Sequence, residues 1–207
     1  MSRSRPMLAA MALLLLAVAP APALAQAAPV AAPAGTYGLD PTHASLTFRV
    51  KHLGLSFYTA RFTRLMGQIE LNPKVPTSSS VNMTIDPRSV RTDFPFPEKE
   101  DFDKVVAERF LGAAKHSEIR FRSTGLVATG ATTGRLTGDL TFNGVTRPVT
   151  LDVTLNGVIE HPFQKVPALG FSARGSLQRS DFGSTELLGP IGDEVELLIE
   201  AEYLLKR

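Results

Sequence analysis

Residues 136–155 constrain the fold more than any other stretch, because they predict a β-hairpin together with its register. Asn143 and Gly144 lie at the centre, and this pair is typical of a two-residue type I′ turn, in which both residues need a positive φ. The turn fixes which residues face each other, so that Leu136 lies opposite Leu151 on an apolar face. Threonines face each other on the opposite, polar side, which predicts a strand pair with one face buried.

Alternation of apolar and polar residues recurs along the chain from about Thr36, and this period of two is typical of half-buried β-strands. Besides the hairpin, it is clear in residues 46–50, 81–85, 119–121, 171–173 and 195–201. About eight strands result. A closed antiparallel β-barrel is the simplest fold for so many half-apolar strands, since closure removes exposed sheet edges.

Two segments depart from this alternation. Residues 100–111 carry Phe102, Val106 and Phe110 at helical spacing, with Gly112 positioned to end a helix, so one short helix is expected to plug or flank the barrel. Between residues 57 and 71 the alternation changes phase, and we interpret the change as a β-bulge at Gly67. The predicted fold class is therefore all-β with one short helix.

The N-terminus reads as a secretory signal peptide, residues 1–25. Arg3 and Arg5 precede a short apolar run, and Ala-Leu-Ala at residues 23–25 fits a small-x-small cleavage pattern. The apolar run is too short to span a bilayer, so no integral membrane segment is expected in the mature chain. Residues 26–35 are rich in Ala and Pro and predict a loose linker, and the barrel domain then occupies residues 36–207. This organisation predicts export to the periplasm.

Charge argues against several classes of partner. The signal peptide holds two of the 22 basic residues and none of the 20 acidic ones, so the mature chain has a formal net charge of zero. Such a chain has no electrostatic footprint for nucleic acid. The four histidines are dispersed and cysteine is absent, so we expect no metal ion. No cofactor is expected either.

Three motifs together resemble one known family. The sequence DPTHASLTFRVKHLG at residues 40–54, the hairpin at 136–155 and QRSDFG at 178–183 are similar to the YceI-like exported polyisoprenoid-binding proteins. The resemblance covers the chain from about Tyr37 to Tyr203. It implies a lipocalin-like barrel whose lumen binds a long isoprenoid, either a polyprenyl phosphate or the tail of a quinone, without chemical turnover. A homodimer is a possible assembly.

The residues expected to line that lumen are mainly apolar side chains on the inner faces of strands and on the helix. His52 and Arg179 join them at strand ends, where an Arg could meet an anionic head group. An alternative for Arg179 is a structural role, in which it pairs with Asp181 or ties down the end of the strand. The full set is Phe48, Val50, His52, Met83, Phe102, Phe110, Phe121, Phe142, Leu151, Val153, Phe171 and Arg179.

Two other functions are compatible with the sequence. A ligand-free structural or stress-response module would have the same strands around a lumen filled by its own side chains, as barrels of about eight strands allow. An envelope enzyme acting on lipids would need an acid–base pair inside the barrel. His52, at the end of an apolar strand face, is the single candidate for that role.

Overall fold

Ten β-strands form one continuous sheet in residues 27–207, which the computed structural model describes. The predicted signal peptide, residues 1–25, lies outside the described residues. The strands are β1 (Gly35–His52), β2 (Ser56–Phe62), β3 (Leu65–Leu71), β4 (Ser80–Ile85), β5 (Val90–Arg91), β6 (Ile119–Ala128), β7 (Thr133–Phe142), β8 (Val145–Glu160), β9 (Pro167–Gln178) and β10 (Ile191–Leu205). Short helical segments join them: α1 (Phe102–Val105), the π-helical η3 (Val106–Phe110) and the 3₁₀ turns η1 (Pro76–Ser78), η2 (Pro87–Ser89) and η4 (Arg179–Phe182).

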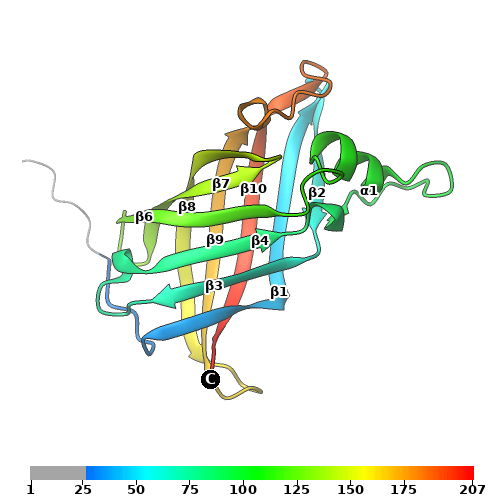
Figure 1. The fold of residues 1–207 in the computed structure, drawn as a ribbon. Helices are drawn as coiled ribbons and strands as arrows, with labels where there is room; N and C mark the ends of the chain where they lie inside the picture. The colour runs from blue at the N-terminus through cyan, green and yellow to red at the C-terminus, as the bar shows by residue number, and fades with distance from the viewer. Residues whose placement is uncertain (1–26) are drawn as a thin grey trace, which may run out of the picture.

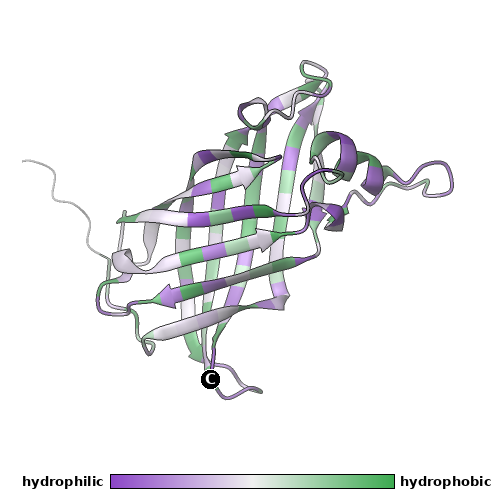
Figure 2. Cartoon of the chain, viewed as in Figure 1, coloured by the Kyte–Doolittle hydropathy of each residue, from purple (hydrophilic) through white to green (hydrophobic). Residues whose placement is uncertain are grey.

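Eight of these strands close into a barrel (Figure 1). Their order around the wall is β1, β3, β4, β6, β7, β8, β9 and β10, and β10 pairs with β1 to close the sheet. Every neighbouring pair is antiparallel. Apolar and polar residues alternate along the strands (Figure 2). The prediction of a closed antiparallel barrel with one short helix is confirmed.

Strand β1 is shared between two neighbours on the same side. Its first residues pair with β3, whereas its second half pairs with β2, in a ladder that includes Phe48 opposite Ala60. The ladder with β10 is interrupted between Leu39 and Ala44, so the four residues between them leave the regular register. Strands β2 and β5 are not part of the closed barrel. They continue the sheet outward from the second half of β1.

The hairpin of β7 and β8 has the predicted register. Asn143 and Gly144 have φ values of 50° and 75°, as a type I′ turn requires, and Leu136 pairs with Leu151. On the polar face, the Oγ1 atoms of Thr137 and Thr150 lie 3.0 Å apart and share a hydrogen bond. Both the turn and the two-faced pattern are therefore confirmed.

The predicted bulge at Gly67 is wrong. Strand β3 pairs with β4 in an unbroken register in which Gly67 faces Met83, and a Cβ at Gly67 would overlap the Met83 sulfur. The change of phase has another origin: β2 ends at Phe62, a turn follows, and β3 starts at Leu65. Gly67 therefore provides room for a neighbouring side chain without interrupting the ladder.

The helix is shorter than predicted and is not uniformly α-helical. Its α-helical part covers only Phe102–Val105, capped by the Asp101 carboxylate that accepts a hydrogen bond from the backbone N–H of Lys104 (3.0 Å), and η3 continues it to Phe110. Gly112 follows with a φ of 66°, as expected for a helix-ending glycine. This helix flanks one end of the barrel (Figure 1).

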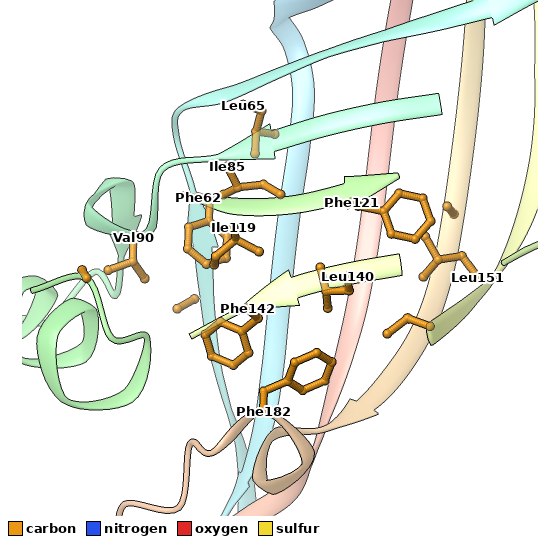
Figure 3. Packing of buried hydrophobic residues seen from close by; sticks show 14 of the residues in the cluster. Phe62, Leu65, Ile85, Val90, Ile119, Phe121, Leu140, Phe142, Leu151 and Phe182 are labelled. Atoms are coloured by element: carbon orange, nitrogen blue, oxygen red, sulfur yellow. The ribbon is translucent and has the colours of Figure 1, made fainter. Parts of the chain in front are cut away.

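The barrel interior is filled beside the helix. There Phe142 packs on Phe182 of η4 with ring centroids 5.6 Å apart (Figure 3). Phe48 packs on Phe62 at 5.4 Å. Ala107 of η3 is buried in the same cluster. The core therefore closes one end of the barrel with aromatic side chains.

The Ala/Pro-rich segment before β1 is held against the barrel where the structure describes it. Ala28 donates its backbone N–H to Ala131 O (3.0 Å), and Val30 donates to Pro73 O (2.9 Å). Residues 27–33 therefore differ from the loose linker expected from composition, because their backbone finds partners in two loops. Among the described residues, no helix has the length and apolar character needed to cross a membrane.

Candidate ligand-binding cavity

A cavity of about 230 Å³ occupies the half of the barrel away from the helix. The inner faces of the barrel strands form its wall, and its rim includes η1, the β6–β7 loop and the segment before β1. The wall includes Leu39, Leu46, Leu65, Ile69, Leu71, Val81, Met83, Ile85, Phe121, Leu126, Leu136, Leu140, Val149, Leu151, Val153, Leu155, Phe171, Ala173, Leu197, Ile199, Ala201 and Tyr203.

The wall is almost wholly apolar. Among the described residues that line the cavity, Glu200 alone carries a charge, and its exposed carboxylate accepts a hydrogen bond from the Ser172 hydroxyl. The Tyr203 hydroxyl donates to the Met83 sulfur across 3.1 Å, and burial raises the pKa of that hydroxyl. The other polar lining residues are Ser45, Thr77, Ser79, Thr132 and Thr133, so most of the wall is hydrocarbon.

The cavity is large enough for part of an apolar chain. An engineered apolar cavity of about 150 Å³ stays dry and admits benzene, and this one is larger. Its wall combines aliphatic side chains with Phe121 and Phe171, and the Phe171 ring meets Tyr203 edge to face at 6.1 Å. Such a surface suits a hydrocarbon and offers few hydrogen bonds to a polar molecule.

Five of the residues predicted for the lumen line this cavity. They are Met83 on β4, Phe121 on β6, Leu151 and Val153 on β8, and Phe171 on β9. Their positions follow from strand parity, because residues two apart point to the same face of a sheet. A direct role of these five in ligand binding remains a prediction.

Three more predicted residues lie beyond the cavity. Phe48 and Phe142 belong to the packed aromatic end of the core, in contact with Phe62 and Phe182. Val50 lies further along β1, opposite Val195 of β10. Parity alone could not separate these positions from the cavity wall, because it gives the face of a strand and not the depth in the barrel.

The two helix phenylalanines are also placed outside the cavity. Phe102 packs against Phe94 and Tyr58, with centroid distances of 5.2 and 6.0 Å, on the far side of the closed end. Phe110 ends η3, and its carbonyl accepts a hydrogen bond from the Ser184 hydroxyl (2.7 Å). The helix therefore stabilises the filled end of the barrel and does not reach the cavity.

His52 lies at the exposed tip of the β1–β2 hairpin, where its carbonyl accepts a hydrogen bond from Leu55 N–H (3.0 Å). A register shift between Val50 and His52 removes this residue from the regular alternation. The expectation that His52 lies in the lumen is corrected accordingly. No imidazole among the described residues lines the cavity.

The side chain of Arg179 has a structural role and is not placed to contact a ligand head group in the cavity. It is 4 % exposed, and its guanidinium donates to four backbone carbonyls at 2.8–3.0 Å: those of Ser184, Glu186, Ile191 and Gly192. Burial lowers the pKa of Arg179. It tethers the loop between η4 and β10, and no donor faces the cavity. Its predicted partner Asp181 is exposed and is not bonded to it.

Two groups of cavity-lining residues lie outside the predicted set. Leu46 and Ile199 follow the apolar alternation of their own strands, which could have indicated them. Leu126 is an odd number of residues from Phe121 and reaches the cavity because the β6–β7 ladder shifts register between Ser123 and Gly125. The second group is Ala27, Ala28 and Val30, which reach the rim of the cavity. No sequence signal pointed to them, because Ala/Pro-rich composition is typical of linkers.

A family model of the YceI-like domain matches residues 37–203, which is most of the chain. The chain belongs to the YceI-like family. A UPF0312 protein of Pectobacterium carotovorum is 36% identical over 182 residues, covering 86% of this chain and 90% of the relative. The family resemblance predicted from the three sequence motifs is confirmed.

Solved structures share the YceI-like barrel. BcnA of Burkholderia cenocepacia superposes with a TM-score of 0.68 at 20% identity, covering 79% of this chain and 98% of its own. A polyisoprenoid binding domain from Saccharophagus degradans superposes with a TM-score of 0.59 at 18% identity, covering 82% and 98%. At these identities the likeness concerns the fold.

The first motif of this YceI-like chain builds a compact polar cluster at the break in β1. Buried Asp40 accepts hydrogen bonds from the Thr42 hydroxyl (2.6 Å) and from His43 Nδ1 (2.9 Å). Burial by itself would raise the pKa of Asp40, but these bonds outweigh it and lower that pKa to about 2. The bond with Asp40 and its charge raise the pKa of His43.

Glu202 completes this cluster. One ligand atom each of Asp40, His43 and Glu202 lies within 4.8 Å of the others. The spacing of the histidines did not reveal the group, because its two carboxylates come from the same bulge and from the distant β10. Both Asp40 oxygens already accept hydrogen bonds within the cluster, and the absence of a metal remains a prediction.

Proposed function

We propose that this protein binds the hydrocarbon tail of an isoprenoid-like lipid in its barrel cavity, as an exported carrier or storage protein without chemical turnover. The single observation that carries the proposal is the apolar cavity, whose wall is built from strands of one rigid barrel. Membership of the YceI-like family and the fold shared with a polyisoprenoid binding domain support it.

Apolar burial provides the affinity that such binding needs. An isoprene unit has five carbons, and at about 0.8 kcal/mol for each buried carbon it contributes about 4 kcal/mol. A few units therefore exceed the roughly 4–15 kcal/mol cost of association. Selectivity must then come from the length of the cavity and from its rim.

The charges around the cavity favour a neutral head group, such as that of a quinone, over a polyprenyl phosphate. The described lining residues include no cation that could pair with a phosphate: Glu200 is the only charged one, and its exposed carboxylate is bonded to Ser172 on the outer face of the sheet. Arg179, the cation expected to meet an anionic head group, is occupied by backbone carbonyls. We therefore assign the cavity to the tail of a neutral isoprenoid lipid.

The side chains of the cavity also support binding without turnover. An acid–base pair in the lumen would be needed for catalysis, and His52, the candidate proposed from sequence, lies at an exposed hairpin tip. The Tyr203 hydroxyl is bonded to the Met83 sulfur. What remains inside the cavity is hydrocarbon and aromatic surface.

Native extraction tests the proposal. The protein is purified without detergent from the organism that produces it and extracted with organic solvent. The extract is then analysed by mass spectrometry. We expect a neutral isoprenoid lipid in stoichiometric amount. An empty extract, together with failure of the pure protein to take up an isoprenoid quinone, would instead favour a ligand-free structural module.

Two adjacent residues of β6 provide matched variants for that uptake assay. Leu126 lines the cavity, whereas Val127 points outward and is 58% exposed. Leu126→Asp places a carboxylate against the tail, so we expect quinone uptake to fall at least about tenfold, since an uncompensated buried charge is strongly unfavourable. Val127→Asp should bind as the wild type does, and equal losses in both variants would contradict the assignment of the cavity.

Export belongs to the same proposal and has its own test. The Arg3/Arg5 region, the short apolar run and the Ala-Leu-Ala site support cleavage after Ala25 and release into the periplasm. The intact mass of protein from a periplasmic extract should correspond to a chain that starts at Gln26. A mass that includes Met1, found in the membrane fraction, would contradict it.

A further inference from the structure

The rim of the cavity contains a segment that is not part of the barrel. Ala27, Ala28 and Val30 line the cavity, although β1 does not start until Gly35. The side chains of Ala27 and Val30 are half-buried, whereas those of Ala28 and Pro29 are exposed. The segment thus lies with one side against the cavity and the other toward solvent.

This segment crosses between two separate loops of the rim. Ala28 N–H donates to Ala131 O in the β6–β7 loop (3.0 Å), and Val30 N–H donates to Pro73 O in the β3–β4 loop (2.9 Å). The same two loops contribute Ala131 and Pro76 to the cavity wall. Figure 1 shows the segment, in dark blue, running along the ends of these strands.

The attachment is firm at one end and weak along the rest. Fully buried Tyr37 donates its hydroxyl to Pro33 O (2.9 Å), and the partly buried Val30 and Ala32 pack on the cluster around Tyr37. Ahead of Pro33, two backbone bonds to loops hold the segment, together with the contacts of small side chains. Segments with few buried contacts open locally at a small fraction of the global unfolding free energy.

We propose that residues 27–32 form a strap across the cavity mouth, which must move aside for a lipid tail to enter or leave, so that the strap sets the exchange rate and the retention of the ligand. This inference rests on the proposed function. Ala, Pro and Val suit the role, because their short side chains cover an apolar opening without filling the space that the tail needs. The strap moves about Pro33, whose carbonyl is held by the hydrogen bond from Tyr37.

A disulfide provides a reversible lock for the strap. The chain contains no cysteine, so an Ala28→Cys/Ala131→Cys variant holds a single pair, and the backbone hydrogen bond between the two residues brings them within the reach of a disulfide. The variant is compared with itself, oxidised and reduced. A second pair needs no oxidation: Val30→Asp puts a charge on the cavity side of the strap, and Ala31→Asp is its exposed control.

Tyrosine fluorescence reports exchange directly. The chain has no tryptophan and three tyrosines, of which Tyr203 lines the cavity, so a short-tailed isoprenoid quinone quenches it on binding. Quenching on mixing measures uptake, and recovery on mixing with excess empty phosphatidylcholine vesicles measures release. We expect oxidation of the cysteine pair to slow both rates about tenfold or more, and Val30→Asp to speed release by a similar factor, with Ala31→Asp unchanged.

The outcomes separate the two proposals. If the wild type binds the quinone and the oxidised, reduced and Val30→Asp proteins all exchange it at the wild-type rate, the strap is overturned and the cavity assignment stands. If the wild type does not quench at all, the cavity assignment fails, and the strap falls with it. Slow exchange only in the oxidised lock, reversed by reductant, establishes the strap.

Discussion

At the scale of single residues, Arg179 shows how a buried charge can be used for architecture alone. Its guanidinium donates to the carbonyls of Ser184 and Glu186 in the loop before β10 and to those of Ile191 and Gly192 at the start of β10. Arginine suits this task because its planar head offers five donors in a fixed arrangement. One side chain therefore joins the two ends of this loop, in addition to backbone hydrogen bonds such as that from Leu188 N–H to Thr185 O (3.3 Å).

Arg179→Met should accordingly lower the melting temperature. Each carbonyl left buried without a donor costs about 1–3 kcal/mol. Arg174→Met, at an exposed arginine of the preceding strand β9, is the matched control and should be neutral. Thermal unfolding of both variants measures the difference. Where Arg179→Met is still folded, its quinone affinity should equal that of the wild type, and a selective loss of affinity would return Arg179 to the binding site.

His43 links stability to pH. Because the bond with Asp40 raises the pKa of His43 in the folded protein, its contribution is present below the unfolded value of about 6.5 and is lost as the pH rises through the folded pKa. His43→Gln should be less stable than the wild type at pH 5.5 and closer to it at pH 8.5. Urea unfolding at both pH values gives the comparison. The control His52→Gln, at the exposed hairpin tip, should have the same stability as the wild type at both pH values.

At the scale of elements, the sequence was most informative where structure is local. The type I′ turn at Asn143–Gly144 determines the β7–β8 register, so pairs as far as Leu136 and Leu151 could be predicted from one dipeptide. Where one strand ends and the next begins, the alternation of apolar and polar residues gave a wrong prediction. The phase change near Gly67 is a turn between two strands.

The sequence predicted which side chains point into the barrel, but not how far along the barrel axis each one lies. Parity placed Met83 and Phe171 at the cavity wall, but it also selected Phe48 and Phe142, which fill the closed end. Continuing the parity of β9 past Gln178 failed for Arg179 because the strand gives way to η4 there. Contacts between distant segments, such as Val30 with the cavity rim, leave no periodic pattern in the sequence.

Gly144 tests the turn that organises this hairpin. Its φ of 75° disfavours any side chain, and a Cβ there would lie 2.5 Å from the His116 ring. Gly144→Ala should destabilise the protein by at least about 1–2 kcal/mol. Gly125→Ala on β6, where a Cβ meets nothing within 4 Å, should be neutral or slightly stabilising. Chemical denaturation of the two variants decides, and equal effects would contradict the role of the turn.

At the scale of the whole molecule, the barrel depends on the pairing of its first strand with its last. The ladder extends from Tyr37 opposite Leu205 to His52 opposite Ile191. A chain that ends before Ile191 should leave β1 and β9 as open edges, and open edges associate. We expect that fragment to elute as aggregates in gel filtration, while removal of Arg207 alone should leave a monodisperse protein. A soluble, folded fragment would show that closure is dispensable.

The pairing of β1 with β10 also has a consequence in time. In a chain synthesised from its N-terminus, β1 can pair with β2 and β3 at once, but its partner on the other side, β10, is made last. Most of the sheet must therefore form first as an open, curved ribbon. Contacts between such distant residues make folding slow. The hairpin of β7 and β8 can form early, whereas the interior becomes enclosed only when β10 arrives. From that moment the interior is continuous with solvent only at the ends of the barrel, so the last strand to be made determines when the cavity exists at all.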